Sequence, residues 1–312
     1  MRAFLFPGQG SQALGMGAAL AQANRTAQDV FDEVDEALGQ SLFRLMREGP
    51  DDELKLTENA QPAIMAHSLA VFRVLTKDGG VKLRKTAAFV AGHSLGEYSA
   101  LCAAGSFDLP TTAKLLKLRG QAMQRAVPVG EGAMAALLGA DLALAQRIAD
   151  AAAQGEICTV ANDNDPTQVV ISGHKAAIDR AITMAKDMGA KRAVPLPVSA
   201  PFHCPLMQPA ADAMRDALGE VIVETPLVPL YANVTAQPET DPDTIRDHLV
   251  EQVTGVVRWR ESIANMADAG VEEFVELGGK VLGGMVKRIA PDAKVTSVVT
   301  IEDIEALAKE IA

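Results

Sequence analysis

The sequence predicts an α/β protein whose mostly parallel sheet is interrupted by a smaller inserted unit. Apolar runs alternate with helical patterns along residues 1–127 and again along residues 198–312. Such alternation is typical of parallel sheets. Between these parts, residues 128–197 change to the order strand, helix, strand, strand, helix, strand, and Pro128 and Pro197 bracket them. We therefore expect a core formed by residues 1–127 and 198–312, with a subdomain inserted at residues 128–197.

The first part of the chain begins the parallel sheet. Apolar runs bounded by turn residues predict its strands, and apolar residues at three- and four-residue spacing predict its helices. Residues 7–12 form a glycine-containing loop directly after the first strand. The expected strands are residues 3–6 and 86–91, and the expected helices are residues 14–38, 60–76, 95–104 and 111–126.

The inserted segment has the βαββαβ order of a ferredoxin-like subdomain. We interpret its residues 162–166, with the sequence Asn-Asp-Asn-Asp-Pro, as a turn. Its expected strands are residues 132–138, 157–161, 168–172 and 193–196, and its expected helices are residues 142–153 and 175–188. After it, the expected strands are residues 228–231, 273–276 and 295–299, and the helices are residues 206–218, 242–252, 261–269, 281–289 and 302–311.

Composition and charge narrow the class of protein. The 312 residues are 48% hydrophobic and 22% charged, as in globular proteins. The formal net charge of −11 opposes binding to nucleic acid, which is itself negatively charged.

The sequence contains an odd number of cysteines at wide spacing, Cys102, Cys158 and Cys204. This pattern predicts reduced thiols and no zinc site. No apolar run is long enough for a signal peptide or a membrane span. We expect a cytoplasmic monomer without membrane or nucleic-acid partners.

The strongest motif is Gly92-His93-Ser94-Leu95-Gly96, between a predicted strand and a predicted helix. A serine nucleophile requires this context, because a sharp turn exposes the hydroxyl and the glycines relieve crowding around it. The alternative is a glycine-rich turn with a capping serine. The flanking strand and helix favour the nucleophile.

A serine nucleophile needs a base, and His203 is the best placed of five histidines. It lies in a proline-bounded loop, residues 199–205, just before a predicted helix, and it follows Ser94 in the chain order of α/β-hydrolase-type enzymes. His93 adjoins Ser94, but its side chain should leave the turn in another direction. A helix-capping role for His203 remains an alternative, and no carboxylate presents itself to orient the imidazole.

Arg119 falls on the apolar stripe of the helix predicted at residues 111–126, four residues after Leu115 and four before Met123. A buried arginine requires an anionic partner, because an unpaired buried charge is costly. That partner is either an Asp or Glu of the protein or a carboxylate of the substrate, which a guanidinium holds with two parallel hydrogen bonds.

Several motifs together resemble malonyl-CoA:acyl carrier protein transacylases, over residues 3 to about 290. In order, these are residues 6–12 (FPGQGSQ), 61–63 (QPA), 92–98 (GHSLGEY), 119–123 (RGQAM), 132–135 (GAMA) and 202–203 (FH). The resemblance implies an α/β-hydrolase-like core with a ferredoxin-like insert. It also implies a cofactor-free transfer of malonyl from malonyl-CoA to acyl carrier protein, for fatty-acid or polyketide synthesis.

The resemblance also implies roles for individual residues. Ser94 would carry the acyl group, His203 would be its base and Arg119 would hold the malonyl carboxylate. The N–H groups of Gln9 and Leu95 would form the oxyanion hole. The main-chain carbonyl of Gln252 would orient His203, which would explain the missing carboxylate. The further residues that we expect to contact substrate are Phe202, Met123, His93, Gln61 and Asn162. The late loop, Gly278-Gly279-Lys280, is one residue shorter than the family's usual Gly-Pro-Gly-Lys.

Two other classes of function share parts of this pattern. A serine hydrolase would use Ser94 and His203 but pass the acyl group to water, and it would not require Arg119. A binding subunit without activity would have no need for the three residues together. Phe202, next to the base, should restrict the site to unbranched malonyl groups. Candidate docking residues for the carrier protein are Lys186, Lys191, Arg192, Lys280, Lys287 and Arg288.

Overall fold

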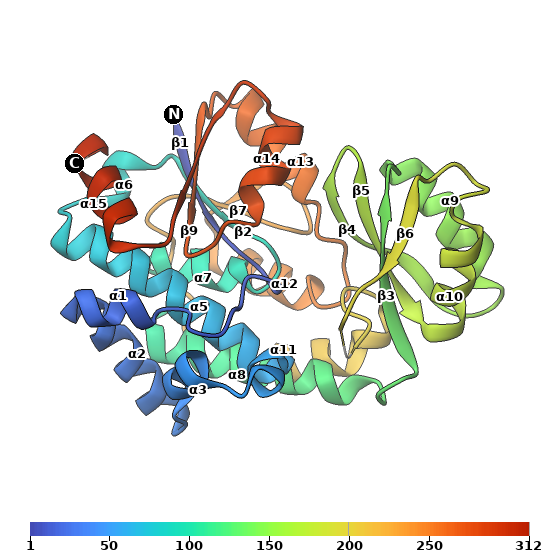
Figure 1. Cartoon of the computed structure of the whole chain (residues 1–312), viewed down its shortest axis with the longest axis horizontal. Helices are drawn as coiled ribbons and strands as arrows, with labels where there is room; N and C mark the ends of the chain where they lie inside the picture. Colours follow the sequence, from blue (N-terminus) through green and yellow to red (C-terminus); the bar gives the residue numbers. More distant parts are fainter. Residues whose placement is uncertain (199, 312) are drawn as a thin grey trace.

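The structure, a computed structural model, describes residues 1–198 and 200–311. Ser199, the first residue of the loop expected before His203, and Ala312 lie outside the described residues. The chain forms a large body and a small body, which stand side by side in Figure 1. Both termini lie on the large body.

Within the described residues, the large body contains a six-stranded sheet with the strand order β10-β9-β1-β2-β7-β8. Its neighbouring strands are parallel except for β8, which is antiparallel to β7. The chain runs from β1 toward β7 on one side and returns to β9 on the other, so the strand order reverses at β1. Ligands of open α/β sheets bind beyond the carboxyl ends of the strands at such a point. The strands are β1 Arg2–Phe6, β2 Phe89–Gly92, β7 Leu230–Tyr231, β8 Pro238–Glu239, β9 Glu273–Leu277 and β10 Lys294–Val298.

Helices surround this sheet. The α-helices of the large body are α1 Ala18–Ala23, α2 Arg25–Leu38, α3 Leu42–Glu48, α4 Asp51–Lys55, α5 Thr57–Arg73, α6 Leu83–Thr86, α7 Gly96–Ala103, α8 Leu109–Ala126, α11 Gln208–Gly219, α12 Pro242–Glu251, α13 Trp259–Asp268, α14 Leu282–Ile289 and α15 Ile301–Ile311. The π-helix η1 spans Val74–Asp78 and the 3₁₀-helix η2 spans Pro205–Met207.

Alternate residues of β1 face opposite sides of the sheet, because successive side chains of a strand point in opposite directions. Phe4 and Phe6 share one hydrophobic core with residues of α2, α5, α7 and α8. Ala3 and Leu5 share another core with residues of α13 and α14. The sheet is therefore a buried central layer with helices on both faces. Since Phe4 is fully buried, its replacement by alanine should cost about 3–5 kcal/mol of stability.

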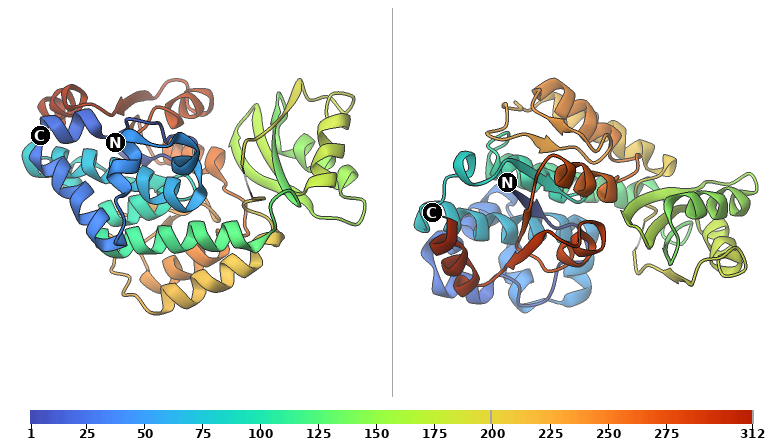
Figure 2. Two further views of the ribbon diagram at one scale, coloured as in Figure 1. Left: turned by 60° about the horizontal axis from the view of Figure 1, so that its bottom comes forward. Right: turned by 90° about the horizontal axis from the view of Figure 1, so that it is seen from above.

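The small body is a four-stranded sheet with the order β4-β5-β3-β6, in which all neighbours are antiparallel. Its elements are β3 Gly132–Leu138, α9 Leu142–Ala153, β4 Cys158–Asp165, β5 Gln168–His174, α10 Lys175–Met184 and β6 Arg192–Pro195. Ala135 and Leu137 of β3 pack with α9 and α10, which cover the outer face of the sheet (Figures 1 and 2). Met134 and Ala136 belong instead to the core of the large body. The predicted fold class, with a parallel-rich sheet and a separate ferredoxin-like unit, is confirmed.

Several predicted elements differ from the structure. The single helix expected at residues 14–38 is divided at Asn24, whose side chain caps α2 by accepting the Ala27 N–H. The strand expected from residue 86 begins only at Phe89, because residues 83–86 form a helical turn. Helices α3 and α4 were not predicted. The helix expected at residues 175–188 ends at Met184.

The turn predicted at residues 162–166 is wrong, since β4 continues to Asp165. Its polar composition is typical of a turn, but here the polar side chains join the two bodies. Buried Asp163 pairs with Arg260 of α13, and fully buried Asp165 pairs with Arg288 of α14, each at 2.8 Å. These ion pairs allow aspartates to occupy a buried strand, because each carboxylate has a cationic partner.

Candidate active site

Ser94 lies in a sharp turn between β2 and α7, at the carboxyl edge of the sheet. Its φ of 54° is in the left-handed region, which is uncommon for a residue other than glycine. The Ser94 N–H donates to Asn233 Oδ1 at 2.8 Å, which helps to hold this conformation. A Cβ on Gly92 would lie 1.9 Å from the Gly96 backbone, and a Cβ on Gly96 would lie 2.2 Å from the Phe6 carbonyl oxygen. Close packing of the turn therefore requires both glycines.

His203 lies opposite Ser94 and is 4% exposed. Its Nε2 is 2.8 Å from Ser94 Oγ, and its Nδ1 is 2.8 Å from the main-chain carbonyl oxygen of Gln252. A carbonyl oxygen can only accept, so Nδ1 carries the proton and Nε2 is free to accept from the serine. Burial, and next the positive charge of Arg119, lower the pKa of His203 to about 3. The imidazole is therefore neutral at physiological pH.

Arg119 projects from α8 into the same site and is 1% exposed. Its Nη1 donates to Gln61 Oε1 at 2.8 Å, and its Nη2 donates to Gln252 Oε1 at 2.7 Å and to Ser94 Oγ at 3.1 Å. Among residues 1–198 and 200–311, no Asp or Glu forms an ion pair with this guanidinium, and its Nε has no hydrogen-bond partner. The salt-bridge alternative considered for Arg119 thus has no direct partner in the described part of the chain.

The N–H groups of Gln9 and Leu95 are available to a ligand. Gln9 follows β1, and Leu95 follows Ser94 at the start of α7. Within the described ranges neither N–H has a hydrogen-bond partner, and both residues line the cavity that contains Ser94. Two such donors beside a nucleophile can stabilise a developing oxyanion.

A cavity of about 340 Å³ brings the predicted residues together. Ser94, His203 and Arg119 line it, and Gln252 lies behind His203 rather than in the wall. The expected substrate contacts that line it are Phe202, Met123, His93, Gln61 and Asn162. The His93 ring leaves the turn toward the small body, where its Nε2 lies 2.8 Å from Asn164 Oδ1.

Comparisons with known proteins identify the family. The acyl transferase domain family matches residues 3–281. The malonyl CoA-acyl carrier protein transacylase of Escherichia coli K12 is 47% identical over 288 residues, which cover 92% of each chain. That of Bacillus subtilis is 44% identical and covers 97% of this chain and 95% of the relative. The chain belongs to the malonyl-CoA–acyl carrier protein transacylase family. It is accordingly an acyltransferase.

Solved members of the transacylase family have the same fold over the whole chain. The acyl-carrier-protein S-malonyltransferase of Bartonella henselae superposes with a TM-score of 0.97 at 53% identity, covering 99% of both chains. A malonyl-transacylase in complex with the holo acyl-carrier protein of a type II PKS superposes with a TM-score of 0.95 at 41% identity, again covering 99% of both chains.

Sequence reasoning gave no role to two buried polar residues of this transacylase site. Glu97, in the first turn of α7, accepts the Asn233 N–H at 3.0 Å and also contacts Gln252 Nε2. Asn233 follows β7, the neighbour of β2, and so lies at the ligand-binding edge of the sheet. A polar residue directly after a buried parallel strand was the available signal. For Glu97, the signal was a carboxylate three residues after the nucleophile, as the single charged residue of α7.

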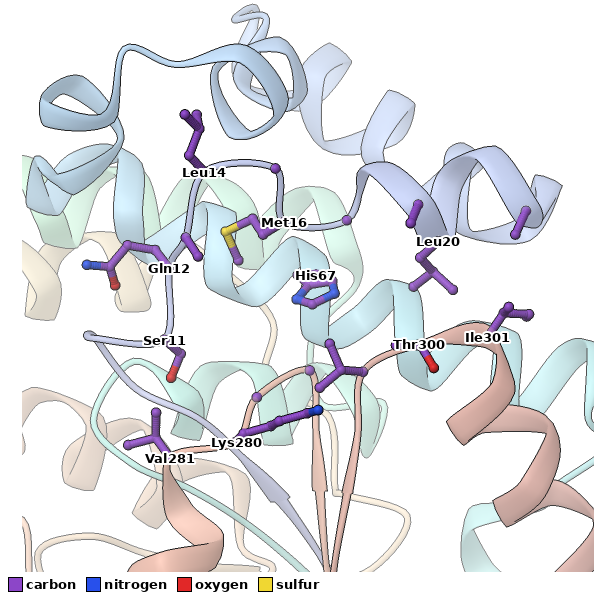
Figure 3. Close-up of a pocket in the computed structure, with 18 of the residues that line it drawn as sticks. Ser11, Gln12, Leu14, Met16, Leu20, His67, Lys280, Val281, Thr300 and Ile301 are labelled. Atoms are coloured by element: carbon purple, nitrogen blue, oxygen red, sulfur yellow. The ribbon is translucent and has the colours of Figure 1, made fainter.

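A second cavity, of about 670 Å³, is larger than the catalytic one but contains none of Ser94, His203 and Arg119. Figure 3 shows it between the loop after β1 and the start of α15, with His67 at its wall. Burial lowers the pKa of His67 to about 4, so this imidazole is neutral. The second cavity shares Gly10 and Gln12 with the catalytic cavity. Reactive groups, rather than volume, therefore identify the active site.

In the described ranges, no cluster of three or more His, Cys, Asp and Glu side chains is arranged to hold a metal ion. The helices of this part of the chain also include none that is both long and apolar enough to cross a membrane.

Proposed function

We propose that this enzyme transfers a malonyl group from malonyl-CoA to the phosphopantetheine thiol of acyl carrier protein through a malonyl-Ser94 ester. The observation that carries the proposal is the position of Ser94 Oγ. It lies 2.8 Å from a neutral imidazole nitrogen and 3.1 Å from a buried guanidinium that has no carboxylate partner in the described residues. A nucleophile, its base and an anion-binding group are thus in one cavity.

In the first half-reaction, His203 Nε2 takes the Ser94 proton while Oγ attacks the thioester carbonyl carbon. The N–H groups of Gln9 and Leu95 donate to the oxyanion. The carbon–sulfur bond then breaks, the imidazolium returns its proton to the sulfur of coenzyme A, and the malonyl-serine ester remains. The Gln252 carbonyl stabilises the transient imidazolium through Nδ1–H.

In the second half-reaction, the carrier-protein thiol replaces coenzyme A. His203 takes the thiol proton, the sulfur attacks the ester carbonyl, and the bond to Ser94 Oγ breaks. The proton then returns to Ser94. The same base, oxyanion donors and guanidinium serve both directions, as a reversible transfer between two thiols requires.

Arg119 selects the acyl group by pairing with the malonyl carboxylate. This pairing also affects the base. The charge of Arg119 helps to lower the pKa of His203, so a bound carboxylate that compensates this charge should raise that pKa. A malonyl group would therefore make His203 a stronger base than an acetyl group would. Phe202 forms part of the wall beside the base and limits the volume available to a branched acyl group.

The proposal includes no metal or organic cofactor, since the chemistry is carried by side chains and main-chain N–H groups. Its partners are malonyl-CoA and acyl carrier protein, and it would supply fatty-acid or polyketide synthesis. We propose a monomer in the cytoplasm, where the free thiols of Cys102, Cys158 and Cys204 would stay reduced.

Mass spectrometry after incubation with malonyl-CoA tests the proposal. One malonyl group should appear on the peptide that contains Ser94, and holo acyl carrier protein should remove it. The Ser94→Ala variant is the control and should remain unlabelled. Equal labelling of this variant would exclude Ser94 as the nucleophile. Release of the label to water as fast as to thiol would indicate a hydrolase instead.

A further inference from the structure

The carboxylate of Glu97 lies behind the catalytic residues and is not part of the wall of the cavity that contains Ser94. The residue is 1% exposed, in the first turn of α7. One oxygen, Oε1, accepts the main-chain N–H of Asn233 at 3.0 Å. The other, Oε2, accepts from the side-chain Nε2 of Gln252. Both partners are N–H donors, so these contacts favour the ionised carboxylate, which accepts through both oxygens.

Gln252, the partner of Oε2, connects Glu97 to Arg119. The Gln252 amide donates through Nε2 to Glu97 and accepts through Oε1 from Arg119 Nη2 at 2.7 Å. Its Nε2 also donates to the Ser94 carbonyl oxygen at 3.0 Å. Reversing the amide would place its NH₂ group against the guanidinium and its oxygen against the carboxylate. Glu97 therefore fixes the orientation of the amide that holds Arg119.

The second partner, Asn233, connects Glu97 to the nucleophile. The Asn233 side chain accepts the Ser94 N–H at 2.8 Å and donates to the Gly92 carbonyl oxygen at 2.7 Å. These two bonds bracket the turn in which Ser94 has its left-handed φ. By holding the Asn233 main chain, Glu97 fixes the position from which that side chain acts.

Charge provides a second reason for a carboxylate at this position. Arg119 is fully buried and has no ion-pair partner in the described part of the chain. Glu97 faces it across the Gln252 amide, and each group favours the charged form of the other. Burial acts in the opposite direction and raises the pKa of Glu97 to about 7. Through the Gln252 amide, Glu97 thus supplies a counter-charge to Arg119 without contacting the guanidinium, which stays open to a ligand.

We propose that Glu97 is a positioning residue that holds Arg119, through Gln252, and the Ser94 turn, through Asn233, in one fixed arrangement. The proposal rests on the acyl-transfer function proposed above. It predicts that loss of the carboxylate should reduce the preference for malonyl over acetyl groups, because only the malonyl group carries a carboxylate with which Arg119 can pair.

The Glu97→Gln variant tests this directly. A neutral amide can accept from only one of the two N–H donors and must point its own NH₂ group at the other. We expect kcat/KM for malonyl-CoA to fall roughly 10- to 100-fold, as it does when a group that orients the side chains ligating a metal ion is removed. The malonyl-to-acetyl ratio of kcat/KM should fall at least about tenfold with it.

Two further variants separate the two arms of the arrangement. Asn233→Ala removes only the support of the Ser94 turn, so malonyl and acetyl transfer should fall by the same factor. Gln252→Leu removes the link to Arg119 and keeps the main-chain carbonyl that orients His203, so the ratio should fall as in Glu97→Gln. This variant also serves if Glu97→Gln does not fold, as judged by its thermal unfolding.

The outcome that would overturn the proposal is an unchanged ratio in folded Glu97→Gln, or in Gln252→Leu, while the parent enzyme forms malonyl-Ser94. Equal losses with both substrates in Glu97→Gln would also overturn it and leave Glu97 as a support of the turn alone. Absence of malonyl-Ser94 in the parent enzyme would instead contradict the proposed function.

Discussion

The large and small bodies contribute to the active site in different ways. Ser94, His203 and Arg119 all come from the large body and are joined by hydrogen bonds at 2.8–3.1 Å. The small body contributes wall residues, among them Met134 and Asn162. It is joined to the large body by apolar packing and by the ion pairs of the two β4 aspartates, Asp163 and Asp165.

The large body thus holds the groups that react, whereas the small body helps to shape the entrance through which substrates reach them. Reactive groups require fixed positions, which the edge of a parallel sheet and a buried hydrogen-bond network provide. A wall from a separate sheet can change the width or charge of the entrance without disturbing the reactive groups. Variants in the large body should therefore change rate and acyl selectivity, whereas variants on the small body should change the KM of a substrate.

The largest effect expected in the large body is that of His203→Ala. Both half-reactions should slow by about 10²- to 10⁴-fold, because each requires removal of a proton by the same nitrogen. Rapid-quench measurement of acylation and of transfer to carrier protein tests this. His174→Ala, in the small body, is the matched control, since within the described residues the His174 side chain bonds only the Ile157 N–H. Near-parental rates in His203→Ala would contradict the assignment and make His93 the next candidate.

The Arg119→Ala variant should affect malonyl-CoA and acetyl-CoA differently, whereas His203→Ala affects both half-reactions alike. Removing one partner of a buried charged pair costs about 2–5 kcal/mol, so kcat/KM for malonyl-CoA should fall by roughly two to three decades or more. Acetyl-CoA has no carboxylate and should lose much less. The measurement is the ratio of the two kcat/KM values, with Arg125→Ala on the same helix as a control. If the ratio stays constant in a folded variant, Arg119 is a structural residue.

Phe202 belongs to the large body and forms part of the cavity wall. The Phe202→Ser variant should therefore widen the cavity beside His203. The rate with methylmalonyl-CoA relative to malonyl-CoA should rise, by roughly 10- to 200-fold if the ring excludes one methyl group. Met123→Ala, elsewhere in the wall, shows whether any enlargement has this effect. An unchanged ratio would mean that Phe202 is a packing residue.

The fold class was predictable from the sequence because periodicity is local. The boundaries of β3 and α9 were predicted to the residue, since each has a simple apolar pattern between turn residues. The end of β4 was not, because three of its last four residues pair with groups distant in sequence: Asp163 with Arg260, Asn164 with His93 and Asp165 with Arg288. Propensity alone cannot distinguish such a strand from a turn.

The candidate site was predictable to the extent that a residue type announces its chemistry. Ser94 and Arg119 stood out from their surroundings, a glycine turn and an apolar stripe. The partners Glu97, Asn233 and the side chain of Gln252 did not, because their role depends on contacts across more than 130 residues of sequence. Only the folded structure brings these segments together.

The pH at which activity falls on the acidic side should depend on the charge of Arg119 in the large body, and not on a charge at the junction with the small body. Burial and Arg119 lower the pKa of His203, whose neutral form is the active base, so activity should persist below the usual histidine pKa of about 6.5. Removing the guanidinium removes one cause of the lowering. In Arg119→Ala, the acid limb of acetyl-transfer kcat/KM should therefore move to higher pH. Two other titratable groups nearby, Glu97 and His93, are present in both enzymes.

A control for this pH shift is Arg260→Ala, which removes a cation at the junction with the small body and should leave the acid limb unchanged. A parental limb in Arg119→Ala would mean that His203 does not govern this part of the profile. A shift to lower pH would contradict the sign argued here.

The smallest effect expected concerns the docking of carrier protein, for which the structure narrows the candidates. Lys287 donates to the Ala293 carbonyl oxygen, and Arg288 pairs with Asp165, so both are already engaged. Arg192 is exposed on β6, the strand that leads into the wall at residues 196–198. Arg192→Glu should raise the KM for carrier protein by roughly two- to fivefold, since exposed ion pairs contribute about 0.2–1 kcal/mol.

The malonyl-CoA KM of Arg192→Glu decides what this side chain recognises. If it stays near the parental value, Arg192 contacts the carrier protein itself, and access is controlled from the small body as the comparison requires. Lys309→Glu on α15 provides the same charge change elsewhere and should affect neither KM. Equal increases for both substrates would indicate a site for the phosphates of coenzyme A. An increase for carrier protein in Lys280→Glu, with none in Arg192→Glu, would place docking on the large body and contradict the division of roles.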